Sequence, residues 1–186
     1  MKKVFMVHGF EGSPNGGWRP WLLGELAKLD IYACALAMPS PDAPLPAEWV
    51  AEIARHVERS AGDEVYLVGH SLGVPAILRY LQTAPTGVHI AGAVLVSGPA
   101  MIRREDPHNL NPFLAGLNFG AIAASAAAFA VIHGDDDEVV PVDHARLLAR
   151  ELGCACTLVP HGGHLNGSAG WLTLPPVVEA LTKMFY

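Results

Sequence analysis

Short apolar runs alternate with longer amphipathic stretches along the whole chain of 186 residues. The runs are rich in Val, Ile and Ala, which is typical of strands buried on both faces. The longer stretches place apolar residues on one helical face, as Trp49, Ile53 and Val57 do. This pattern predicts strands at 4–7, 31–37, 64–68, 90–96, 129–132 and 154–159, and helices at 18–29, 46–60, 74–82, 142–152 and 171–184.

The repeated order of strand and helix predicts an α/β fold. We expect about six strands in a mostly parallel sheet with helices on both faces. The chain contains no linker or repeat, so residues 1–186 are expected to form a single domain.

The stretch 97–128 is the least regular part of the pattern. It must supply a crossover to the next strand, which takes about a dozen residues or more, so no cap domain is expected. The remainder, around 101–112, predicts a loop beside a shallow, solvent-reachable cleft. Candidates for an apolar wall of this cleft are Met101, Ile102, Phe113 and Leu114.

Composition narrows the functional classes. Hydrophobic residues make up 51% of the chain and charged residues 16%, which suits a covered sheet. The net charge is −6 and the basic residues are scattered, so the sequence lacks the basic cluster that is typical of nucleic-acid binding. The first apolar run is too short for a signal peptide or a membrane span. Cys34, Cys154 and Cys156 lack zinc-ligand spacing, and they favour a reduced, cytoplasmic protein without a metal or other cofactor.

The sequence Gly-His-Ser-Leu-Gly occupies residues 69–73. It follows the apolar run 65–68 and precedes a helical pattern that begins at Val74. A G-x-S-x-G motif between a strand and a helix is the pattern of a nucleophile elbow, in which a sharp turn presents the serine hydroxyl. The motif therefore predicts Ser71 as a catalytic nucleophile.

An acid is expected after a later strand of the sheet, because the motif's partners follow in the order serine, acid, histidine. Asp135, Asp136 and Asp137 all follow the predicted strand 129–132. The carboxyl end of a parallel strand lies on the same rim of the sheet as the elbow. We favour Asp137 as the triad acid and retain Asp136 as the alternative.

The base is expected in the loop after the last predicted strand. His161 and His164 compete for this role. A Gly-Gly pair at 162–163 can bend the loop inward before His164, whereas His161 directly follows the strand end. We favour His164 as the general base.

An oxyanion hole needs two backbone N–H groups aimed at the developing charge. Leu72 follows the nucleophile at a helix N-terminus and is the first candidate. Phe10, which follows Gly9 after the first strand, is the second. Neither dinucleotide-binding nor P-loop glycine spacing follows this strand, which argues against nucleotide binding.

With these motifs the chain resembles an α/β-hydrolase and, more narrowly, the small serine hydrolases of the retinoblastoma-binding-protein-9 and YdeN type. The motifs that carry the resemblance are 69–73, Trp-Arg-Pro-Trp-Leu at 18–22, Met-Pro at 38–39, 137–141 and Gly-His-Leu-Asn at 163–166. The resemblance implies the triad Ser71, Asp137 and His164 and a six-stranded sheet. Because no Leu-x-Cys-x-Glu occurs, binding of the retinoblastoma protein through that motif is not supported.

The expected function is therefore a serine hydrolase of carboxylesterase type that cleaves small acyl esters through an acyl-enzyme. The expected partner is a small-molecule acyl substrate, with no nucleic acid, no membrane and no identified protein partner. The alternative is a catalytically weak protein of the same fold that acts as a protein-interaction module. Such proteins usually lose a triad member, whereas all three are present here.

Overall fold

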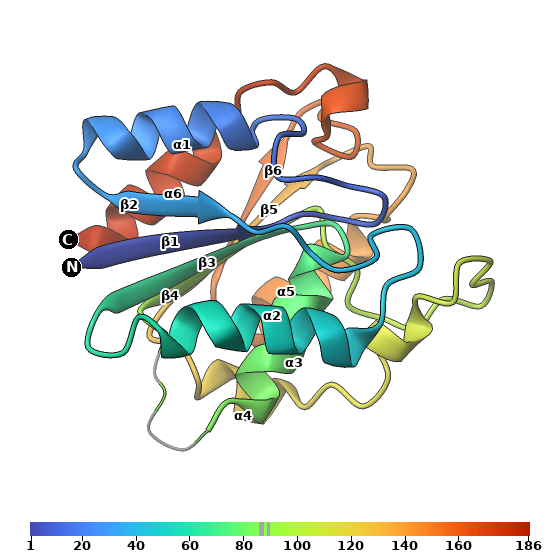
Figure 1. Ribbon diagram of the computed structural model, residues 1–186. Coiled ribbons are helices and arrows are strands. Elements are labelled where there is room, and N and C mark those ends of the chain that lie inside the picture. Colours follow the sequence, from blue (N-terminus) through green and yellow to red (C-terminus); the bar gives the residue numbers. More distant parts are fainter. Residues whose placement is uncertain (86–87, 89) are drawn as a thin grey trace.

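The computed structural model describes residues 1–85, 88 and 90–186 (Figure 1). Its centre is a six-stranded sheet in which every neighbouring pair is parallel, in the order β2-β1-β3-β4-β5-β6. The strands are β1 (Lys2–Val7), β2 (Tyr32–Ala35), β3 (Glu64–His70), β4 (Gly92–Val96), β5 (Phe129–Gly134) and β6 (Ala155–Val159). The predicted α/β fold with about six mostly parallel strands is confirmed.

Helices cover both faces of this sheet, as predicted (Figure 1). One face carries α1 (Arg19–Lys28) and α6 (Pro175–Phe185), and the other carries α2 (Pro46–Glu58), α3 (Gly73–Thr83), α4 (Phe119–Ala123) and α5 (Asp143–Glu151). Two short 3₁₀ helices, η1 (Asn111–Phe113) and η2 (Gly167–Ala169), lie in loops. None of the helices in the described part of the chain is long and apolar enough to cross a membrane.

The core has two layers because successive residues of a strand point to opposite faces of the sheet. Phe5, Leu67 and Leu95 pack with helices α2 to α5. Val4 and Val68 pack on the other face with α1 and α6. The strands are buried on both faces, which explains why they appear in the sequence as continuous apolar runs.

The predicted elements differ from the observed bounds by one or two residues at their ends, except that the last helix begins four residues later than expected. The strand expected from residue 31 to 37 ends at Ala35. The last helix, expected from residue 171, begins at Pro175. Trp171 instead belongs to the preceding loop, where its indole N–H donates to the carbonyl of Gly162 over 2.7 Å. This contact holds Trp171 in the loop, and Pro175 occupies the first position of the helix, where proline is favoured.

Residues 97–118 form a loop, and no cap domain lies over the sheet within the described residues. The prediction of an apolar wall from this region is only partly right, because only Leu114 of the four candidates lines a cleft. Phe113 is fully buried and packs on Trp49 with ring centroids 5.6 Å apart. Met101 and Ile102 are exposed to solvent.

The order of the strands places the site. The chain moves from β1 outward to β2, then returns to β3 on the other side of β1. Ligands of open parallel sheets bind outside the carboxyl ends of the strands where the order reverses in this way. The loops after β1 and β3, which contain Phe10 and Ser71, leave the sheet at this point.

Candidate active site

Ser71 lies at the turn between β3 and α3 with a φ of 53°, a left-handed conformation that a non-glycine residue rarely adopts. Its backbone N–H donates to the carbonyl of Val96 over 2.9 Å, which fixes the turn to the neighbouring strand. The glycines of the motif allow the close approach. A Cβ added to Gly73 would lie 2.3 Å from the Val7 carbonyl oxygen, and one added to Gly69 would lie 2.9 Å from the backbone of Gly73.

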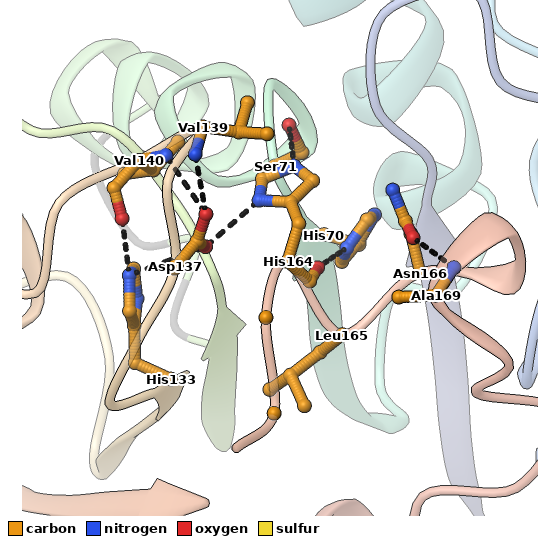
Figure 2. A network of polar contacts seen from close by, with 12 residues as sticks. His70, Ser71, His133, Asp137, Val139, Val140, His164, Leu165, Asn166 and Ala169 are labelled. Carbon is orange, nitrogen blue, oxygen red and sulfur yellow. Dashed lines mark hydrogen bonds and ion pairs between the residues drawn. The ribbon is translucent and has the colours of Figure 1, made fainter.

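Ser71, His164 and Asp137 form one hydrogen-bonded chain (Figure 2). The Ser71 Oγ lies 2.9 Å from His164 Nε2, and His164 Nδ1 lies 2.8 Å from Asp137 Oδ2. An ionised carboxylate can only accept hydrogen bonds, so Nδ1 carries a proton and Nε2 accepts the serine hydroxyl proton. The structure thus brings the three predicted catalytic residues together in the order that serine hydrolysis requires.

The Asp137 side chain has no exposed surface. Its Oδ1 accepts hydrogen bonds from the backbone N–H groups of Val139 and Val140, both over 2.9 Å. Burial raises the pKa of the Asp137 carboxyl, but the hydrogen bonds from His164 and from the two amides outweigh it, and the net pKa is lowered. The carboxylate therefore remains ionised while it is shielded from water.

The other two aspartates have a different role. Asp136 is half exposed, and its Oδ1 accepts a hydrogen bond from the backbone N–H of Gly163 over 2.8 Å. Asp135 accepts the N–H of His161 in the same way, also over 2.8 Å. Both carboxylates fasten the loop that carries His164 without touching its imidazole.

Besides Trp171, which donates to Gly162, two more side chains hold this loop, and the sequence analysis identified none of these contacts. His70 Nε2 donates to the carbonyl of His164 over 2.9 Å (Figure 2). The Trp18 indole donates to the carbonyl of Leu165, also over 2.9 Å. The only signals in the sequence were the position of His70 inside the elbow and that of Trp18 at the start of the first predicted helix. Neither position indicates a hydrogen-bond partner.

The predicted oxyanion donors lie beside Ser71. Leu72 is the N-cap of α3, and its backbone N–H has no acceptor among the described residues. The backbone N–H of Phe10 also lacks an acceptor there. Gly9 permits the approach of this loop, because a Cβ at Gly9 would lie only 2.8 Å from the Cβ of Ser71.

The family model for serine hydrolases matches residues 4–183. The chain belongs to this serine hydrolase family. It is 35% identical over 185 residues to the protein YdeN of Bacillus subtilis (strain 168), covering 99% of this chain and 96% of YdeN.

Solved structures show the same fold for this serine hydrolase. The crystal structure of the B. subtilis ydeN gene product superposes with a TM-score of 0.92 at 34% identity, over 100% of this chain and 99% of that one. Est1E from Butyrivibrio proteoclasticus superposes with a TM-score of 0.78 at 16% identity, over 99% and 88% of the two chains. At that identity Est1E supports the α/β-hydrolase fold alone.

Two hollows open beside Ser71 and His164 of the hydrolase, and both residues line each of them. The larger hollow, of about 430 Å³, has mostly apolar walls, which include Leu72, Pro99, Leu110, Leu114, Val139 and Val140. The smaller hollow, of about 200 Å³, is lined by Trp18, Arg19, His70, Asn166 and Ser168 among others. The candidate nucleophile thus lies where a mostly apolar hollow meets one with a more polar lining.

One group of side chains in the described part of the hydrolase has metal-ligand spacing. It consists of Asp135, Asp136 and His161, whose ligand atoms lie within 4.8 Å of one another. All three are exposed, and both carboxylates already bind backbone N–H groups of the His164 loop. These hydrogen bonds explain Asp135 and Asp136 as residues that hold the His164 loop in place.

Proposed function

We propose that this hydrolase is a carboxylic-ester hydrolase that cleaves small acyl esters through an acyl-enzyme. The proposal rests above all on the hydrogen bonds that join Ser71 Oγ to His164 and His164 to the buried Asp137. A serine hydroxyl is a weak nucleophile unless a base accepts its proton, and this arrangement supplies both the base and the group that orients it.

In the proposed reaction His164 Nε2 takes the proton of Ser71 as Oγ attacks the ester carbonyl carbon. Asp137 stabilises the imidazolium, and the N–H groups of Leu72 and Phe10 donate to the oxyanion. The tetrahedral intermediate collapses, the C–O bond to the alcohol breaks, and His164 returns its proton to the leaving oxygen. Water then attacks the acyl-enzyme with His164 again as base, which releases the acid and restores Ser71.

The size and apolar lining of the larger hollow suit an apolar acyl group of modest size. Leu110, Leu114 and Val140 provide apolar wall next to Ser71. Loop residues Arg103 and His108 border the same hollow, and no cap domain covers it within the described residues. Small esters should therefore enter directly from solvent.

Covalent labelling by a fluorophosphonate probe tests this function, with Ser71→Ala and Ser168→Ala compared. Ser168 also lines the smaller hollow, but its hydroxyl donates to Asn166 rather than to a histidine. The wild type and Ser168→Ala should be labelled and should hydrolyse p-nitrophenyl butyrate, whereas Ser71→Ala should do neither. A folded wild type that is neither labelled nor active would favour the protein-interaction module instead.

A further inference from the structure

Arg19 is a buried cation without an anionic partner. Arg19 is the first residue of helix α1, and only 6% of its surface is exposed. Its Nε donates to the carbonyl of Ser13 over 3.0 Å, and no carboxylate within the described residues lies within 4.0 Å of it. Burial lowers the pKa of the guanidinium to about 10, so it remains charged at neutral pH.

The guanidinium borders the smaller hollow, which it shares with Ser71 and His164. Its two terminal nitrogens have no hydrogen-bond acceptor in the described part of the chain, and neither is closed off from solvent. Their N–H donors are therefore available to a molecule in this hollow.

The surroundings add to the positive potential. The first turn of α1 contains no acidic residue that would offset the helix dipole. Asn166, on the same hollow, turns its Oδ1 toward the N–H of Ala169, which leaves the amide nitrogen as a further donor (Figure 2). His70, which also lines the hollow, adds no charge to it, because burial lowers the pKa of its imidazole to about 3 and keeps the ring neutral at physiological pH.

A buried charge is unfavourable unless an opposite charge compensates it, and guanidinium groups match the two oxygens of a carboxylate. We propose that the smaller hollow binds a carboxylate on the alcohol portion of the substrate, with Arg19 as its partner, so that the preferred substrates are acyl esters of hydroxy acids. This inference rests on the proposed esterase function. The alcohol portion is assigned here because the apolar walls of the larger hollow suit the acyl chain.

The test compares two esters with leaving groups of the same shape, 3-carboxyphenyl butyrate and 3-carbamoylphenyl butyrate. The wild type should favour the carboxylate by about tenfold to a hundredfold in kcat/KM, as expected for a charge-assisted hydrogen bond. Arg19→Gln should lose most of this preference, and Arg19→Lys should retain part of it. Arg150→Gln removes an exposed charge on α5 and should leave the preference unchanged.

A structural role for Arg19 would lower kcat/KM for both esters equally and leave their ratio unchanged, which would overturn the inference. A preference for a carboxylate on the acyl side, measured with p-nitrophenyl hemiglutarate against p-nitrophenyl glutaramate, would also overturn it. If Arg19→Gln does not fold, inhibition of the wild type provides the test. The product 3-hydroxybenzoate should then inhibit more strongly than 3-hydroxybenzamide, and equal inhibition would contradict the proposal.

The two proposals fail in different ways. If the proposed esterase function is wrong, neither ester is cleaved, whether or not Ser71 is labelled by a fluorophosphonate. If only the carboxylate site is wrong, Ser71 is labelled and both esters are cleaved, but their ratio does not depend on Arg19.

Discussion

The imidazole of His70 donates its Nε2–H to the backbone carbonyl of His164, 2.9 Å away, although the two residues are 94 positions apart in the chain. The residue that precedes the candidate nucleophile thus holds the loop that carries the candidate base. The two imidazole rings are tilted against each other with centroids 5.1 Å apart. A shift of the His70 ring would therefore move His164 relative to Ser71.

This contact predicts that stability depends on pH. Burial, and next the nearby His164, hold the pKa of His70 at about 3, against 6.5 in an unfolded chain. Between these values the unfolded chain binds a proton that the folded protein does not, so the free energy of unfolding falls as the pH falls below 6.5. At pH 5 the loss from His70 alone should be roughly 2 kcal/mol.

Urea unfolding of wild type and His70→Gln at pH 7.5 and pH 5 measures this effect. The variant should lose less stability between the two pH values. It should still lose some, because burial also lowers the pKa values of His8, His133 and His144. His161→Gln, at an exposed position, should behave as the wild type. An unchanged slope in His70→Gln would contradict the assignment.

Asp137→Asn should lower kcat by about 10⁴ with little change in substrate binding, because an amide cannot hold the productive tautomer of His164. Asp136→Asn is the matched control. Its Oδ1 can still accept the N–H of Gly163, so kcat should remain within several-fold of the wild type. Both values come from steady-state hydrolysis of a p-nitrophenyl ester, with circular dichroism to check folding. A severe loss in Asp136→Asn with a near-normal Asp137→Asn would move the role of the acid by one residue.

Two helical glycines should respond oppositely to alanine. Gly24→Ala places a Cβ in open space on the exposed side of α1 and should stabilise the protein by about 0.5–1 kcal/mol. Gly73→Ala places a Cβ 2.3 Å from the carbonyl oxygen of Val7 and should destabilise by about 1–3 kcal/mol while disturbing Ser71. Thermal unfolding and fluorophosphonate labelling measure the two effects. A neutral Gly73→Ala would show that the elbow tolerates a wider turn.

The acyl-length dependence tests the open cleft. For p-nitrophenyl esters, kcat/KM should rise over short acyl chains while the apolar wall at Leu110 and Leu114 is covered, and then level off. Each buried methylene contributes about 0.8 kcal/mol, which sets the slope of the rising part. A continued rise to long chains, or a jump in rate at a lipid–water interface, would reveal a binding tunnel or a moving lid.

Local pattern predicted much of this protein. Alternation of apolar runs and amphipathic stretches determined the order of strands and helices, because side-chain periodicity records which face of an element is buried. The G-x-S-x-G motif located Ser71 in the same way, since the glycines at 69 and 73 are required by contacts within the turn and with the adjacent strand. The order of acid and histidine after the motif followed from the positions of strands β5 and β6 along the chain.

Tertiary structure decided what adjacent residues of the same type do. Asp136 and Asp137 are neighbours of equal charge, but the turn directs one carboxylate to solvent and the other into the core beside His164. Likewise, nothing in the local sequence around Arg19 shows that its buried guanidinium lacks a carboxylate, because such a partner could come from any part of the chain. Periodicity determines which elements form, whereas long-range packing determines which polar groups meet and which remain available to a ligand.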